Sequence, residues 1–451
     1  GVEIKVSERS LADSEAFAAA EAGIEYARWQ LAHASYVVTE KTEATYPYRD
    51  AGGNAVGTFT ITITPPSGCD SAITIRARGA SAKDPRRTRA IAVRYGATPL
   101  TRYAFLTNAN IWFGGADELK GPVHANGGIR MDAKSSARMT SAKATYICGT
   151  EHGCSPPVTK PGVWGSGDGG KKGLWDFPLP AIGFQKIATD LRALQMQAQN
   201  ANTYFGPSGA FGYHITLQTN GTAIITRVTA VQQKIWGYDG RNGWVETAEG
   251  IAQEMAVRSM TIPEATGCGV ANLLFFEDTV WVDGATKHPV TIVAGRLPIS
   301  DATDASIFIN GNLTTPASGD AGKEGTIGLI AQKDILIPLA APDTLELHAA
   351  LIAQNGHVFR NYYCSDEKLN KYGYKCNRAY APLVLRNALH LKGTIVTNQT
   401  TAWSWVDAKG SVISGYRGGE STYETRLIIT PPPFFPTEGA YRILSWEEVR
   451  E

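Results

Sequence analysis

The sequence lacks a long apolar run, because no 18 consecutive residues are apolar anywhere in its 451 residues. As written, it therefore holds nothing that spans a membrane. It also lacks the charged segment followed by an apolar stretch that marks a secretory signal. The chain opens at Gly1, without a start Met, inside a segment with helical character. We expect a processed or truncated product whose targeting segment has been removed.

A surplus of either charge is also missing. Lys and Arg total 43 and Asp and Glu total 42, so the formal net charge is +1. Domains that bind nucleic acid usually carry a basic surplus or stripe, so we predict no nucleic-acid partner. Hydrophobic residues make up 43% of the chain, which supports buried cores and excludes global disorder.

Common catalytic signatures are absent. The sequence contains neither a GxSxG elbow nor an HExxH motif. Residues 165–170 formally match a dinucleotide fingerprint, but a Pro-rich loop precedes them and Trp175-Asp-Phe-Pro178 follows, where strand and helix are required. His348, His357 and His390 could form a metal site only if their strands stack and bring the three side chains together. We predict no enzyme, no metal site and no cofactor.

Six cysteines form no zinc-binding pattern. Cys148 and Cys154 bracket one short loop, and Cys364 and Cys376 bracket another. Small loops closed by disulfides fit these spacings and indicate an oxidising, exported setting. The two bridges are predictions from proximity, and the partners of Cys69 and Cys268 stay open.

Residues from about 6 to 33 have the composition of one helix, since Ala is dense and Pro is absent. A helix of this length needs packing along one side. The period then changes to two in residues 57–63, 72–77 and 87–94. These alternating segments predict a small antiparallel sheet laid on the helix.

The remaining chain shows three local patterns. Residues 155–180 are rich in Gly and Pro and predict a loop, and residues 182–200 have the apolar spacing of a second helix. Residues 236–245 predict a hairpin. Its Trp236, Tyr238 and Trp244 either form cross-strand pairs or stack on sugar.

A short apolar strand that ends in Asn or Gln recurs after residue 103. Such corners end at Asn126, Gln332, Gln354 and Asn398. In a parallel β-solenoid, Asn is able to take left-handed geometry at corners and to form amide ladders between coils. Because the spacing is irregular, an antiparallel β-sandwich remains the alternative.

Acidic residues between the predicted strands indicate an alternative, enzymatic function. Asp301, Asp304 and Asp334 lie in or near turns between predicted strands. Solenoids that cleave polysaccharide gather carboxylates on one face, where they act as acid and base. An exported β-helix enzyme acting on polysaccharide is therefore the alternative function, although acids are common in turns anyway.

The N-terminal helix resembles a known family. Residues 19–27, Ala-Ala-Glu-Ala-Gly-Ile-Glu-Tyr-Ala, are similar to the amphipathic helix of type IV pilins and of PilX-type pilus assembly proteins. The resemblance implies a prepilin leader and an apolar membrane segment upstream, both missing from this chain. Residues 105–108, 121–127, 430–437 and 443–447 resemble the large domain often attached to such stems.

Together these observations predict a mostly β protein in three parts: a pilin-like helix at 1–35, a small antiparallel sheet at 36–100, and a large solenoid-like head at 101–451. The expected function is that of a minor, adhesive pilin-like subunit, extracellular on a pilus and anchored in the inner membrane before assembly. Its partners would be other pilin subunits, with a surface or glycan ligand for the head. A passive surface adhesin unrelated to pili is a third hypothesis. The predicted subunit contacts are the Ala face of the helix with Glu15, Phe17, Glu21, Ile24 and Glu25.

Overall fold

The computed structural model describes residues 2–33, 38–66, 72–114, 118–167, 172–184, 191–264, 270–298, 304–316, 325–407 and 409–449. Cys69, Cys268 and Asp301 lie outside these ranges. The chain divides into two compact units, Gly1–Thr98 with Gly439–Glu451, and Pro99–Glu438. Each unit is considered by itself.

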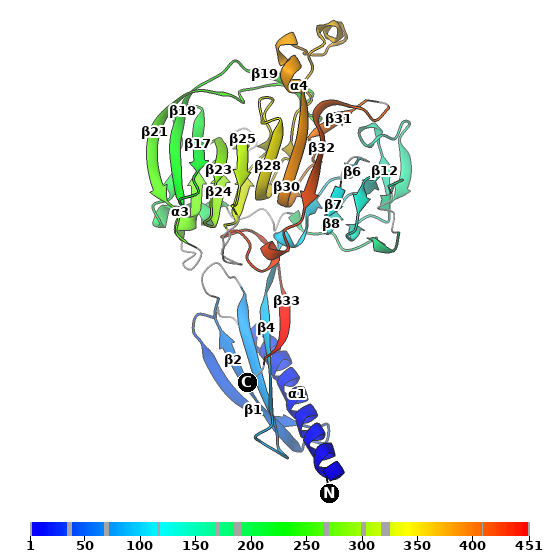
Figure 1. Cartoon of the computed structure of the whole chain (residues 1–451), viewed down its shortest axis with the longest axis vertical. Helices are drawn as coiled ribbons and strands as arrows, with labels where there is room; N and C mark the ends of the chain where they lie inside the picture. Colours follow the sequence, from blue (N-terminus) through cyan, green and yellow to red (C-terminus); the bar gives the residue numbers. More distant parts are fainter. Residues whose placement is uncertain are drawn as a thin grey trace. The chain divides into compact units, whose positions relative to one another are not determined.

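The first unit contains one long helix and a five-stranded sheet (Figure 1). Its elements are α1 (Val2–His33), β1 (Thr42–Arg49), β2 (Ala55–Thr64), β3 (Ile73–Ser81), β4 (Thr88–Pro99) and β33 (Thr437–Val449). They follow the order β1-β2-β3-β4-β33, and β1 to β4 are antiparallel. The predicted helix and the three predicted strands are confirmed. The predicted head extended to residue 451, whereas β33 completes the sheet of this unit.

Small residues allow α1 to approach the sheet closely. Ala16 and Ala20 are fully buried on the helix, and Gly79 lies opposite them on β3. A Cβ atom at Gly79 would lie 2.0 Å from the carbonyl oxygen of Ala16 and 2.5 Å from the backbone nitrogen of Ala20. Ile61, Ile75 and other β-branched residues fill the core around this contact.

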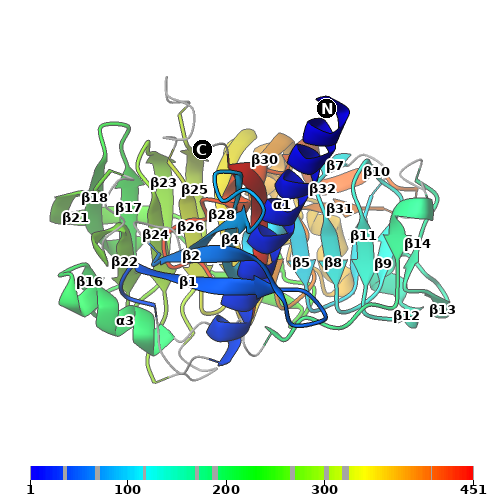
Figure 2. The same cartoon turned by 90° about the horizontal axis from the view of Figure 1, so that it is seen from below.

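The second unit is built from parallel ladders of short strands. The longest ladder runs β16 (Tyr204–Phe205), β22 (Leu273–Phe276), β24 (Val290–Ala294), β26 (Ile327–Ala331), β28 (Thr344–Ala353), β30 (Leu385–Thr397), β5 (Phe105–Thr107), β8 (Val123–Ala125), β11 (Met139–Ser141) and β15 (Trp175–Asp176). Figure 2 shows these strands side by side in a row. Parallel ladders between successive coils make this unit solenoid-like rather than an antiparallel sandwich.

Further parallel ladders complete the coils. A second one contains β17 (Gly212–Leu217), β23 (Val280–Ala285), β25 (Ile307–Thr314), β27 (Ile335–Leu336) and β29 (Val358–Phe359). A third contains β6 (Ile111–Phe113), β9 (Ile129–Met131) and β14 (Val163–Trp164). A fourth joins β30 to β32 (Val412–Thr422), β7 (Glu118–Lys120) and β10 (Lys134–Ser135).

Antiparallel pairs are confined to excursions from the coils. They comprise β18 (Thr222–Val231) with β17 and with β21 (Ile251–Thr261), β12 (Thr145–Cys148) with β13 (Val158–Pro161), β19 (Ile235–Tyr238) with β20 (Trp244–Thr247), and β31 (Ser404–Val406) with β32. The β19–β20 pair confirms the predicted hairpin.

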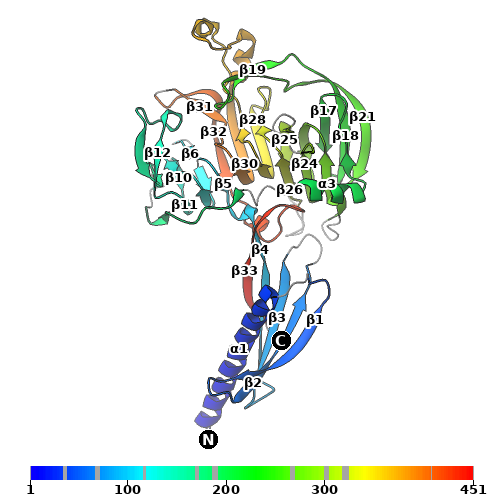
Figure 3. The same ribbon diagram turned by 180° about the vertical axis from the view of Figure 1, so that it is seen from behind.

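Chain order and spatial order differ in this unit. β5 is the first strand of this unit along the chain, yet it pairs with β30, and the two lie side by side in the middle of the head (Figure 3). From β5 the coils run to β15, whereas β16 begins the coils at the opposite end and β30 returns to the middle. The chain therefore enters and leaves this unit near its centre.

Both faces of the longest ladder are buried. Its inward side chains form the main core, and its outward side chains, such as Phe275 and Ile352, pack against helix α3 (Leu191–Asn200) and against Phe435. Burial on both faces explains strands such as β24 and β26, in which every residue is buried. A second short helix, α4, spans Ala381–Val384.

Two predictions of local structure need correction. Residues 155–180, predicted as a loop, contain β13, β14 and β15, because strands of two to four residues carry too little periodicity to be recognised. The second helix was predicted from residue 182; Ile182 and Gly183 are not helical, whereas Phe184 is, and α3 spans Leu191–Asn200. Residues 185–190 lie outside the described ranges.

Asparagine side chains link neighbouring coils at one corner. Asn108 donates from its Nδ2 to Oδ1 of Asn398 at 2.9 Å, and Asn126 donates to Oδ1 of Asn108 at 2.8 Å. Two of the predicted corners, Asn126 and Asn398, are therefore linked by amides, whereas Gln332 donates to the backbone carbonyl of Arg296. None of the four predicted corner residues has a positive φ.

We predict that Gly79→Ala loosens the first unit, because the added methyl group displaces the α1 backbone. Overpacking of this kind costs about 1–3 kcal/mol of the free energy of unfolding. Hydrogen–deuterium exchange of α1 peptides, followed by mass spectrometry, measures the effect as faster exchange. Thr58→Ala, at an exposed position on β2, is the control. Equal exchange in the two variants would contradict the close approach.

Candidate functional site

The exposed face of α1 carries two of the predicted contact residues. Glu21 and Glu25 are exposed, and Glu25 forms an ion pair with Arg28 at 2.7 Å. Leu11 and Trp29 are large apolar side chains that are 47% and 57% exposed. They are 18 positions apart, about five turns, so they lie on one line along the helix.

The opposite face of α1 is covered by the chain's own sheet. Ile24 is 3% exposed and belongs to the core of the first unit, as do Ala19 and Ala27. The predicted subunit contacts through Ile24 and the Ala face therefore need correction, because those side chains contact β2 and β3. Apolar residues occur on both sides of α1, and the sequence did not indicate which side the sheet covers.

Phe17 and Glu15 also have partners within the unit. The Phe17 ring lies 6.3 Å from the ring of Trp446, and the guanidinium of Arg89 lies over it at 5.6 Å. Glu15 accepts hydrogen bonds from Ser81 Oγ and Lys83 Nζ, both at 2.6 Å. The bond from Lys83, followed by that from Ser81, lowers the pKa of Glu15. Both side chains tie α1 to neighbouring strands.

Both predicted disulfides are present. Cys148 is bonded to Cys154, and Cys364 is bonded to Cys376. Each bridge closes a short loop that projects from a coil. The local spacing of the cysteines was therefore a sufficient signal for these two pairs.

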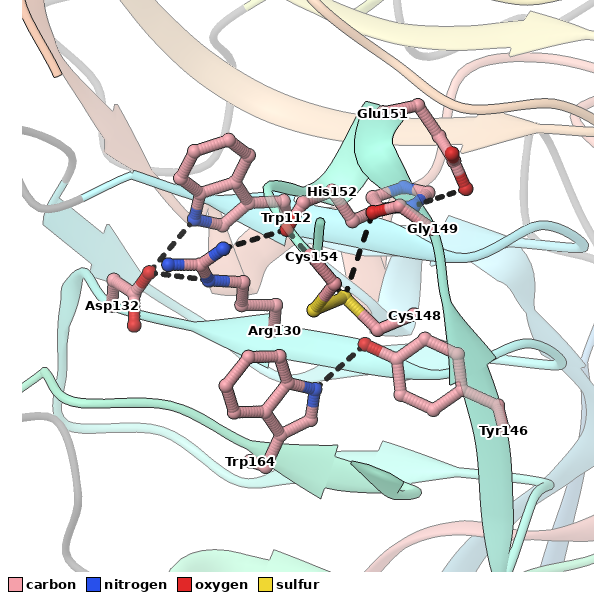
Figure 4. Close-up of a disulfide and its surroundings, with 10 residues drawn as sticks. All are labelled: Trp112, Arg130, Asp132, Tyr146, Cys148, Gly149, Glu151, His152, Cys154 and Trp164. Atoms are coloured by element: carbon pink, nitrogen blue, oxygen red, sulfur yellow. Dashed lines mark hydrogen bonds and ion pairs between the residues drawn. A yellow bond between two sulfur atoms is a disulfide. The ribbon is translucent and has the colours of Figure 1, made fainter. Parts of the chain in front are cut away.

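Beside the first disulfide, a stack of side chains holds the β12–β13 hairpin on the coil (Figure 4). The guanidinium of Arg130 lies over the rings of Trp112 and Trp164, at 4.3 and 5.1 Å. Arg130 also donates to Oδ2 of Asp132 and to the carbonyl of His152, both at 2.7 Å. These partners give Arg130 a structural role, because Asp132 and the two rings balance its positive charge within the stack.

Of the acids of the alternative enzyme hypothesis, Asp334 has partners on a neighbouring coil. Asp334 accepts a hydrogen bond from the backbone nitrogen of His357 at 3.0 Å, and its carboxylate lies 3.6 Å from His357 Nε2. It therefore links two coils at a corner. Asp304 lies just before β25, and Asp301 is outside the described residues.

The strands of His348 and His390 do stack, since β28 pairs with β30, but His348 lies opposite Lys392 and His390 lies opposite Glu346. His357 stacks on Phe359, with ring centroids 4.0 Å apart. Within the described ranges, no three His, Cys, Asp or Glu side chains form a group able to hold a metal ion.

Glu249 is a buried carboxyl group that the sequence did not single out. It is 3% exposed and accepts hydrogen bonds from Tyr363 Oη at 2.5 Å and from the backbone nitrogen of Leu339 at 2.8 Å. Burial raises the pKa of Glu249 to about 7, although these bonds and the nearby Arg360 act in the opposite direction. No local pattern in the sequence marks this Glu, since its partners come from distant segments.

Comparisons with known proteins identify no family. No family model and no curated protein matches the chain. Among solved structures, the competence-associated pilin ComZ from Thermus thermophilus is similar at 14% identity, with a TM-score of 0.28, over 97% of this chain and 98% of ComZ. At that TM-score the similarity carries no argument about this chain. None of the helices in the described ranges is both long enough and apolar enough to cross a membrane.

We predict that Glu249→Gln changes how the stability of the second unit depends on pH. The folded pKa of Glu249 is raised to about 7 from an ordinary 4.5. Between those values the unfolded chain releases its proton while the folded chain keeps it, so the stabilisation is present below pH 4.5 and is lost as pH rises towards 7.

The variant should therefore gain stability relative to the wild type as pH rises through this window, by on the order of 2–3 kcal/mol. Chemical denaturation at pH 4.5, 6 and 8 measures the free energy of unfolding of both proteins. Their difference isolates Glu249, because the other titrating groups contribute equally to both. A difference that does not change with pH would show that the carboxyl ionises normally.

Proposed function

We propose that this protein is a pilin-like subunit of a type IV pilus or a related filament. The exposed face of α1, with Leu11 and Trp29 on one line, is the observation that carries the proposal. The sheet covers one face of α1 and leaves apolar side chains on the other. Packing of such a face against the helix of a neighbouring subunit would remove both side chains from water.

The second unit suggests a minor subunit. It takes up most of the chain, from Pro99 to Glu438, and so is large for a protein repeated at every position of a slender filament. Under the proposal this unit is displayed on the outside, where it works in adhesion rather than catalysis. The disulfides Cys148–Cys154 and Cys364–Cys376 support an extracellular setting. Before assembly, the membrane anchor would be the segment implied by the resemblance to pilins.

Trp29→Lys, made in the full-length gene, tests the contact. A charge on the exposed line of α1 should reduce the amount of this protein in purified filaments at least tenfold, because it would be buried against a neighbouring helix. Since Trp29 is 57% exposed, the variant should fold normally, with the free energy of unfolding changed by less than about 0.5 kcal/mol.

Phe211→Lys is the matched control, because Phe211 is 46% exposed and lies on the second unit. Normal incorporation of Trp29→Lys would overturn the proposed contact. Filaments built wholly from this protein would contradict a minor role. A gene that encodes an ordinary secretory signal joined directly to Gly1 would favour an adhesin unrelated to pili.

A further inference from the structure

Two excursions from the coils meet on the second unit. The β19–β20 hairpin and the segment that leads into the Cys364–Cys376 loop are joined by paired backbone hydrogen bonds between Tyr238 and Tyr362, each 2.9 Å long. Figure 1 shows β19 at the same end of the head as α4, which follows this loop in the chain. Segments more than 100 positions apart in the chain thus form one surface.

Aromatic side chains cover this junction. We call the following six residues the aromatic surface: Trp236, Tyr238, Trp244, Tyr362, Tyr372 and Tyr374. The ring of Trp244 lies 5.9 Å from Tyr238, 6.0 Å from Tyr362 and 5.7 Å from Tyr374. Tyr238 and Trp244 are the predicted cross-strand pair, but the contacts extend well beyond the hairpin.

The rings are not fully enclosed by these contacts. Tyr372 is 69% exposed and Tyr374 is 39% exposed, while the other four rings are half-buried. The loop that carries Tyr372 and Tyr374 is closed by the Cys364–Cys376 disulfide. Large aromatic side chains this accessible on such a loop expose apolar surface to a ligand.

The polar ends of these rings are also free. Among the described residues, no hydrogen-bond partner occurs for the Tyr hydroxyls or Trp indole nitrogens of the aromatic surface, and none of these atoms is a buried unsatisfied group. Structural aromatics nearby differ, since Trp405 donates to the carbonyl of Arg360 at 3.0 Å and Tyr363 donates to Glu249 at 2.5 Å. The aromatic surface therefore combines apolar ring faces with unused donors.

Lysines lie at the edge of the same surface. Lys371 Nζ lies 4.8 Å from the ring centroid of Tyr372, and Lys375 Nζ lies 5.5 Å from that of Trp236. Neither lysine has a carboxylate partner within ion-pair distance in the part of the chain that the structure describes. Their positive charge is available to a ligand that carries carboxylates.

We propose that the aromatic surface binds a glycan and prefers acidic sugars. The C–H face of a sugar ring packs on Tyr and Trp, its hydroxyl groups accept hydrogen bonds from the free ring ends, and its carboxylate pairs with Lys371 or Lys375. A nucleic acid fits less well, because the whole chain has a net charge of only +1. This inference rests on the proposed display of the second unit on a filament.

Calorimetric titration of the purified chain with oligogalacturonate and with cellohexaose tests the inference. Both sugars should bind, and oligogalacturonate should bind more tightly. The double variant Tyr372→Ala/Tyr374→Ala should weaken both at least tenfold. Lys371→Gln/Lys375→Gln should weaken oligogalacturonate alone. The control is Tyr441→Ala, because Tyr441 is 54% exposed but belongs to the first unit.

Three results would overturn the inference: no binding of either sugar, binding unchanged in the Tyr372→Ala/Tyr374→Ala protein, or tighter binding of a single-stranded oligonucleotide of equal charge. A circular dichroism spectrum identical to that of the wild type shows that the variants are folded. Glycan binding by a chain that fails to enter filaments would refute the proposed function and leave this inference standing. Normal incorporation of the protein into filaments without glycan binding would refute this inference and leave the proposed function standing.

Discussion

The second unit depends on the parallel pairing of β5 with β30. Ile395 donates to the carbonyl of Ala104 at 2.9 Å, and Asn108 donates to the carbonyl of Thr397 at 3.1 Å. The side chains of Asn108 and Asn398 continue this contact across 290 positions of sequence. Without it, the coils on either side would each end in an open edge, which is prone to wrong pairing. The two ends of the unit also meet, since the backbone nitrogen of Leu100 donates to the carbonyl of Pro436 at 3.1 Å.

Strong local periodicity made part of the fold predictable. The Ala-rich helix and the alternating strands β2, β3 and β4 each carry their signal within a few residues. β1 is exposed along most of its length and packs on the core only through Tyr46 and Tyr48, so its signal is weaker. The order of the coils was not predictable, because the partners in the central pairing lie far apart and no local pattern encodes which strands meet.

The candidate sites that could be predicted were again those whose partners are close together in the sequence. Cys148 with Cys154 and Cys364 with Cys376 are close in sequence, and both pairs were found. The face of α1 was misjudged because helical spacing separates Leu11 from Ile24 without showing which of the two the sheet covers. Glu249 stayed hidden because its partners, Leu339 and Tyr363, come from other coils.

Within the coils, backbone N–H and C=O groups pair along the parallel ladders. The excursions lie outside these ladders, so other contacts must hold their backbone in place. Beneath the aromatic surface this support comes from Glu249 and from Arg360, which is fully buried and donates to backbone carbonyls, among them Leu339 and Leu383, at 3.3 and 3.0 Å. A disulfide closes the loop above. Tyr374 packs on Trp244 and Tyr362 and so also supports the loop, whereas Tyr372 is 69% exposed. The ring surface that these contacts leave open is where the proposed ligand would pack.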